Sequence, residues 1–111
     1  MLEDIDDVQI SEDAFGRAVK FILVKLKEGQ KSMMIFRASA AEFHNDIYME
    51  LLDGLDKGIE AEVTGGGWLH IVMEGKFIRI WGASTTFGPP DFETARQLLH
   101  ERYPDFRIET G

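Results

Sequence analysis

The run Arg17–Lys27 (RAVKFILVKLK) constrains the fold of this 111-residue chain more than any other segment. It is rich in branched and aromatic side chains, and its four central residues, Phe21 to Val24, are all apolar. Successive side chains of a strand point to opposite faces, so such a run is typical of a strand that is covered on both sides. After the turn Glu28-Gly29-Gln30, Lys31–Arg37 (KSMMIFR) predicts a second strand of similar character.

Two amphipathic segments predict helices that cover this sheet. Ser39-Ala40-Ala41-Glu42 matches the capping box of a helix start, so we expect a helix to begin at Ser39 and to stop at Gly58. Its apolar residues recur at helical spacing: Phe43, Ile47, Leu51 and Leu55. A second helix is expected over 91–103, with Asp91 as N-cap and Pro104 as terminator.

Four further segments predict strands: 60–64, 68–74, 76–83 and 105–109. Glu74-Gly75 predicts a tight hairpin turn, and Gly65-Gly66-Gly67 is interpreted as a flexible connection between two strands. The predicted order β-β-α-β-β-β-α-β is an α+β fold, a mainly antiparallel sheet of about six strands sandwiched between two helices.

Charge divides the chain into an acidic N-terminal segment, 1–13, and a single domain, 14–111. The first 13 residues hold six acidic and no basic residues, whereas the other 98 hold 14 acidic and 12 basic ones. The domain is therefore near neutral, which leaves room for a local cationic site and argues against a nucleic-acid partner. We expect a monomer.

The absence of cysteine excludes disulfides, cysteine zinc sites and thiolate nucleophiles. No zinc-type histidine spacing and no acidic calcium loop is present, so we expect no metal and no cofactor. The sequence has no apolar run of membrane-spanning length and no signal-peptide pattern, so we expect a cytoplasmic protein without a membrane partner.

His44 is the histidine with the strongest case for chemistry. His70 and His100 fit ordinary positions on a strand and on a helix face, whereas His44 lies in Glu42-Phe43-His44-Asn45-Asp46-Ile47-Tyr48, close to the strand that carries Arg37. A nearby helix N-terminus favours a neutral imidazole that can donate its lone pair. With Ser39 as the cap, His44 would lie just beyond the first turn, and we expect this effect to be modest.

The segment 82–90 (GASTTFGPP) is a candidate anion site. Small hydroxylic residues between glycines let backbone amides and hydroxyl groups converge on an anion, although a plain strand-to-helix loop also fits. Lys20 and Arg37 are cations that would complete such a site, although both also fit surface positions.

Four blocks in order closely resemble the protein histidine phosphatase (Janus/Ocnus) family, over about Val8 to Ile108. They are EFHNDIY at 42–48, TGGG at 64–67, IWGASTTFGP at 80–89 and RYPDF at 102–106. The resemblance implies a small, metal-independent phosphatase that removes phosphate from phosphohistidine in proteins, built on a sheet between two helices.

The resemblance also implies roles for individual residues. The catalytic histidine of the family corresponds to His44, the substrate-binding lysine to Lys20, and the anion loop to Ser84, Thr85 and Thr86. An arginine before the first helix corresponds to Arg37 if a one-residue gap is allowed. The chain departs from the best-known animal members at Trp68, where they have an arginine after the glycines.

Two mechanisms and two functions fit the sequence. His44 would act either as a nucleophile that takes up the phosphoryl group or as a general base that activates water. Its substrates would be phosphohistidine-containing proteins or small phosphoramidates. The alternative function is a non-catalytic phosphate- or phosphoprotein-binding module of the same fold, which Trp68 would suit.

Overall fold

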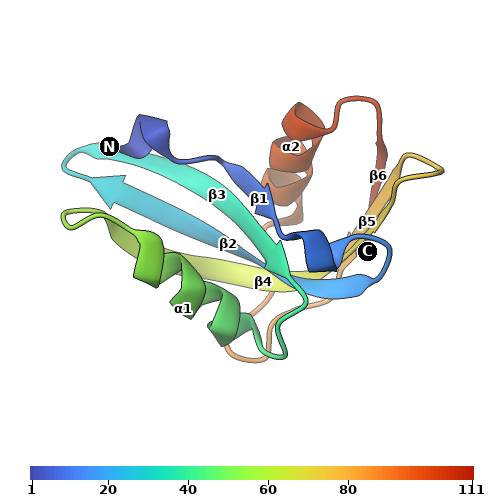
Figure 1. The fold of residues 1–111 in the computed structure, drawn as a ribbon, viewed down its shortest axis with the longest axis horizontal. Helices are drawn as coiled ribbons and strands as arrows, with labels where there is room; N and C mark the ends of the chain where they lie inside the picture. The colour runs from blue at the N-terminus through green and yellow to red at the C-terminus, as the bar shows by residue number, and fades with distance from the viewer.

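The two long strands β2 (Ala18–Glu28) and β3 (Lys31–Ser39) lie side by side in a six-stranded sheet. The computed structural model describes residues 1–111 (Figure 1). The sheet order is β1-β3-β2-β4-β5-β6, with β1 at Val8–Ile10, β4 at Glu60–Val72, β5 at Phe77–Trp81 and β6 at Arg107–Thr110. β1 pairs in parallel with β3 and β6 with β5, and the other three pairs are antiparallel. The predicted α+β class with a mainly antiparallel sheet is confirmed.

One helix covers each face of the sheet, as predicted. α2 (Phe92–Arg102) packs over a core that includes Phe21 and Leu23, and α1 (His44–Gly54) packs over one that includes Ile22 and Val24. All four of these strand residues are fully buried. The apolar run in β2 therefore faces two cores, and we call the two sides of the sheet the α1 face and the α2 face.

The three glycines lie inside a strand, so the prediction of a flexible connection between two strands was wrong. β4 runs unbroken from Glu60 to Val72. A Cβ on Gly65 would lie 2.3 Å from the Pro89 oxygen, and one on Gly67 would lie 2.6 Å from the Trp81 oxygen. The glycines are needed because other backbone segments come so close to the strand that they leave no room for a side chain.

Helix α1 begins five residues later than predicted. β3 continues through Ser39, whose hydroxyl accepts from the Ala41 amide and caps no helix. The helix starts at His44, and the Phe43 amide donates to the Asp46 carboxylate at 3.1 Å. It ends at Gly54, before the predicted stop at Gly58, which has a φ of 93° in the following loop. His44 is therefore the first residue of the helix, where the dipole effect is strongest.

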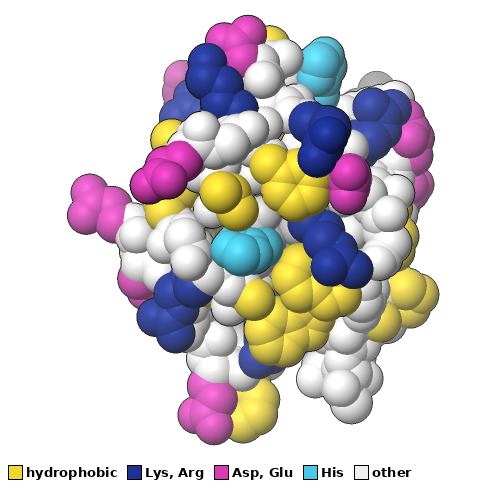
Figure 2. All heavy atoms as spheres, turned by 90° about the vertical axis from the view of Figure 1, so that its right-hand side faces the viewer, with side chains coloured by type: hydrophobic (Ala, Val, Ile, Leu, Met, Phe, Trp, Pro, Cys, Tyr) yellow, Lys and Arg dark blue, Asp and Glu magenta, His cyan; other side chains and the backbone are white.

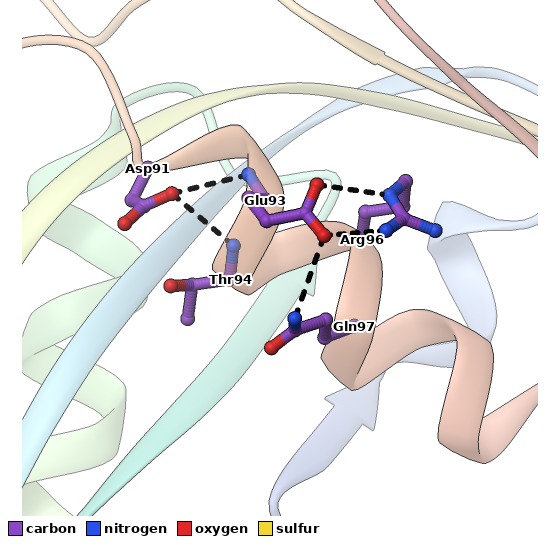
Figure 3. A network of polar contacts seen from close by, with 5 residues as sticks. All are labelled: Asp91, Glu93, Thr94, Arg96 and Gln97. Atoms are coloured by element: carbon purple, nitrogen blue, oxygen red, sulfur yellow. Dashed lines mark hydrogen bonds and ion pairs between the residues drawn. The ribbon is translucent and has the colours of Figure 1, made fainter.

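The C-terminal elements match their predictions more closely. β4 and β5 form the expected antiparallel hairpin. Figure 3 shows the start of α2, where the Asp91 carboxylate accepts from the Glu93 and Thr94 amides as an N-cap. Helix α2 ends at Arg102, two residues before Pro104.

The acidic N-terminal residues contribute to the fold. Besides β1 they form two short 3-10 helices, η1 (Leu2–Asp4) and η2 (Glu12–Ala14). Leu2 and Val8 are buried, one in each core. β1 was not predicted, because three residues are too few to show an alternating pattern. Neither helix of the protein has the length and apolar character needed to cross a membrane.

Candidate active site

The His44 side chain is held by the backbone of β4. It is 6% exposed, and its Nε2 lies 2.9 Å from the Gly67 carbonyl oxygen. A carbonyl oxygen only accepts hydrogen bonds, so Nε2 carries the hydrogen and donates it. In the neutral ring the lone pair is then on Nδ1. The geometry thus sets both the orientation and the tautomer of the imidazole.

The surroundings of His44 favour its neutral form. Burial lowers the pKa of His44 below its ordinary value of 6.5, and the nearby positive charge of Lys20 lowers it further. The hydrogen bond to Gly67 opposes these effects but does not reverse them. The ring is therefore uncharged at neutral pH, with Nδ1 able to accept a proton or to attack an electrophile.

Gly66 brings the imidazole close to Ser84. A Cβ on this glycine would lie 2.9 Å from His44 Cδ2 and 3.3 Å from the Ser84 Cβ. The two side chains therefore meet over the same point of β4, on the α1 face. His44 and Ser84 are 40 residues apart in the sequence. Both side chains can approach β4 closely because Gly66 has no side chain at this point.

The loop that follows β5 is tied down at Ser84. The Ser84 amide donates to the Gly66 carbonyl at 2.8 Å, and Ser84 and Gly88 form an isolated backbone bridge. The Ser84 hydroxyl accepts from the Phe87 amide at 3.0 Å. Thr85 and Thr86 form the exposed tip, and their two amides donate to no group of the protein. Unpaired amides next to hydroxyl groups are the donors that an anion requires.

Lys20 is the cation nearest to this site. It lies on the α1 face of β2, directly across from Trp68 of β4, and its charge acts on His44. Its ammonium group lies 4.5 Å from the centroid of the Trp68 ring, which is cation–π geometry. The aromatic ring thus holds the ammonium beside the imidazole.

Trp68, which directly follows the three glycines, belongs to an aromatic pair. Its ring stacks on that of Trp81 in β5, with centroids 6.4 Å apart and planes at 16°. Gly82 has a φ of 76°, and a Cβ there would lie 3.0 Å from Trp68 Cδ1. The indole cannot pair with a phosphate as an arginine would, but it supports Lys20.

Arg37 lies in a different part of the α1 face. Its guanidinium donates to the Phe36 and Asp6 carbonyls at 2.9 and 2.7 Å, and burial lowers its pKa against the opposing effect of Asp6 and Asp7. It lines a cavity of about 540 Å³ between α1 and the N-terminal segment, which contains none of His44, Lys20 and Ser84. The structure brings His44, Lys20 and the 84–86 loop together but does not bring the Arg37 guanidinium to them.

Gly66 and Gly67 are the site residues that the sequence analysis missed. The run of three glycines was visible, but nothing in a single sequence says which side chains pack on a glycine.

The other two histidines lie apart from the site: His70 pairs across strands with Arg79, and His100 is exposed on α2. No group of three or more His, Asp or Glu side chains is arranged to hold a metal ion.

Comparison with known proteins identifies the family of this chain. The model of the Janus/Ocnus family (Ocnus) matches residues 2–107. The sex-regulated protein janus-A of Drosophila pseudoobscura pseudoobscura is 32% identical over 119 aligned positions, which cover 99% of this chain and 77% of that protein. The 14 kDa phosphohistidine phosphatase of Homo sapiens is 26% identical over 113 positions, which cover 94% and 88%. That of Sus scrofa is 27% identical over 116 positions, which cover 96% and 90%. The chain therefore belongs to the Janus/Ocnus family.

Proposed function

We propose that this protein is a metal-independent phosphohistidine phosphatase with His44 as its catalytic residue. The observation that carries the proposal is the neutral imidazole, oriented through Nε2 by the Gly67 carbonyl, next to a loop with two unpaired amides. The similarity to two proteins named 14 kDa phosphohistidine phosphatase supports the same activity. Its substrates are phosphohistidine-containing proteins or small phosphoramidates.

The phosphoryl group binds to the 84–86 loop and Lys20. The amides of Thr85 and Thr86 and the nearby hydroxyls donate to the non-bridging oxygens, and the Lys20 ammonium offsets their charge. The P–N bond of phosphohistidine is labile, and phosphoryl transfer passes through a loose transition state. Positioning and charge stabilisation are therefore the main tasks of the site.

Two routes use the lone pair on Nδ1 of His44. In the first, Nδ1 attacks phosphorus, the P–N bond to the substrate imidazole breaks, and water then hydrolyses phospho-His44 to release inorganic phosphate. In the second, Nδ1 takes a proton from water while the water oxygen attacks phosphorus and the same P–N bond breaks. Either route makes the ring cationic. The hydrogen bond from Nε2–H to the Gly67 carbonyl oxygen then becomes stronger, because its donor carries a charge.

The test is release of phosphate from a phosphohistidine peptide and from phosphoramidate in the presence of EDTA. We expect release by the parent and a loss of at least about 100-fold in His44→Ala, the usual size of an acid–base or nucleophilic contribution. His100→Ala is the matched control, because His100 is exposed on α2 and should leave the rate unchanged. Comparable activity in His44→Ala would refute the proposal, and radiolabelled phosphate trapped on the protein would select the nucleophilic route.

The second candidate function is a phosphate-binding module without catalysis. Trp68 favours it, because the site has one cation fewer than it would with the family arginine. Saturable binding of the phosphohistidine peptide without release of phosphate would support the module and exclude the phosphatase.

A further inference from the structure

The part of the α1 face formed by β5 is not covered by a helix. α1 contacts β2, β3 and β4 and lies away from β5 (Figure 1). In β5, Ile78 and Ile80 are buried toward α2, whereas Phe77, Arg79 and Trp81 point to the opposite face and remain partly or fully exposed. This part of the sheet therefore presents side chains directly to solvent.

The exposed side chains form a row that alternates in character. Lys20 lies over Trp68, Trp68 stacks on Trp81, and the Arg79 guanidinium lies 5.1 Å from the centroid of Trp81. We call these four residues the aromatic–cation row. Figure 2, which faces this end of the molecule, shows a broad hydrophobic patch bordered by Lys and Arg side chains.

The row carries positive charge on an acidic protein. Beyond it, Arg107 of β6 lies 5.0 Å from the ring centroid of Phe77, and His70 pairs across strands with Arg79. Glu109 is the acidic residue across from Arg79, and it pairs with Arg107 at 3.7 Å, so Arg79 keeps its charge for a partner. Aromatic and arginine side chains are also the types that contribute most at protein interfaces.

The row starts at the candidate active site. Lys20 is the site cation, and Trp68 directly follows Gly67, whose carbonyl orients His44. From β2 through β4 to β5 the row crosses two strand spacings, about 10 Å, which an extended chain spans with about three residues. The row is therefore within reach of the residues that flank a phosphohistidine bound at His44.

We infer that the aromatic–cation row is the docking surface for the polypeptide segment next to the phosphorylated histidine, and that it selects acidic residues there. The inference rests on the proposed function. Carboxylates suit the Arg79 guanidinium, and the apolar stems and planar groups of such a segment suit the two indoles. The net charge of −8 repels a long polyanion but tolerates a few carboxylates, so the row fits a peptide rather than a nucleic acid.

The experiment compares phosphohistidine peptides that have acidic, neutral or basic residues at the three positions on either side of the histidine. We expect kcat/KM to be about tenfold higher for the acidic than for the neutral peptide and lowest for the basic one. In Arg79→Glu, kcat/KM for the acidic peptide should fall at least fivefold relative to kcat/KM for phosphoramidate, which has no flanking chain. Arg102→Glu, the same charge change on exposed α2, should keep the preference.

Binding measurements separate this inference from the proposed function. Anisotropy of the labelled, unphosphorylated acidic peptide should report binding that Arg79→Glu weakens and Arg102→Glu does not. Such binding without any phosphate release would keep the docking surface and refute the phosphatase. If the protein hydrolyses phosphoramidate but shows no preference among the acidic, neutral and basic peptides, the docking surface is refuted and the phosphatase is retained. The same conclusion follows if a single-stranded oligonucleotide binds as tightly as the acidic peptide.

Discussion

The two faces of the sheet differ in what they bury. The α2 face holds a core of 13 buried apolar residues, whereas the core under α1 has six. The four buried polar or charged side chains, Arg37, Ser39, His44 and Ser84, all lie on the α1 side. Burying polar groups costs free energy unless they are hydrogen-bonded. A face that places polar side chains in a site therefore has fewer positions for a purely apolar core. The α2 face stabilises the fold, and the α1 face carries the candidate chemistry.

The largest effect on stability should come from the α2 face. Phe21→Ala removes a fully buried ring that stacks on Phe36 at 4.7 Å, and it should lower the free energy of unfolding by about 3–5 kcal/mol. Phe43→Ala is the matched control, because that ring is 59% exposed beside α1. Denaturant titration checks both, and equal losses in the two variants would contradict the division of the faces.

Gly66→Ala should affect both stability and activity. The new methyl group would lie 2.6 Å from the Phe21 oxygen and 2.9 Å from His44, so the strand and the ring must move apart. We expect a loss of about 1–3 kcal/mol in unfolding free energy, typical of overpacking, together with lower phosphatase activity. Gly75→Ala, where the nearest atom is 4.0 Å away, should leave both unchanged in melting and activity assays.

Trp68→Leu should weaken the binding of inorganic phosphate about two- to fivefold, since an exposed cation–π contact contributes about 0.5–1 kcal/mol. The leucine stays apolar but no longer holds the Lys20 ammonium. Trp68→Arg should tighten binding, because it adds a cation. Isothermal titration with phosphate measures both, and Phe77→Leu serves as the control at the far cation–π pair. Unchanged affinity in Trp68→Leu would show that the ring does not support Lys20.

The smallest expected effect is on the pH profile. In the proposed mechanism the active form of His44 is neutral, and its pKa lies below 6.5, so activity should persist at pH 6.5 and fall only on further acidification. Lys20→Met removes one cause of the low pKa, so the acid limb should move to higher pH. NMR titration of the His44 ring checks the direction, and a limb that stays in place would contradict the role of the charge.

Much of the fold could be predicted because it depends on local patterns. The two-sided apolar run of β2 and the Asp91 cap of α2 each express their structure within a few residues. The start of α1 and the continuity of β4 could not be predicted in this way. Ser39 has a capping-box sequence, but its pairing with Lys20 keeps it in β3, and that contact joins residues far apart in the chain.

The candidate site was predicted in part, for the same reason. His44, Lys20 and Ser84 could be found from motifs, and the structure brings them together. The hydrogen bond between His44 and Gly67 could not be found, because a backbone carbonyl has no signature in a sequence. Arg37 shows the converse. Its position in the chain suggested the site, but the carbonyls of Phe36 and Asp6 hold it elsewhere.

The Gly67 carbonyl also affects how this protein tolerates mutation. Many enzymes orient a histidine with an aspartate or glutamate, which one codon change can remove. Here the orienting oxygen belongs to the main chain, and every amino acid supplies one. A substitution therefore releases the ring only by displacing β4 or the start of α1, and within β4 the most sensitive position is Gly66, where a Cβ would lie 2.9 Å from His44 Cδ2.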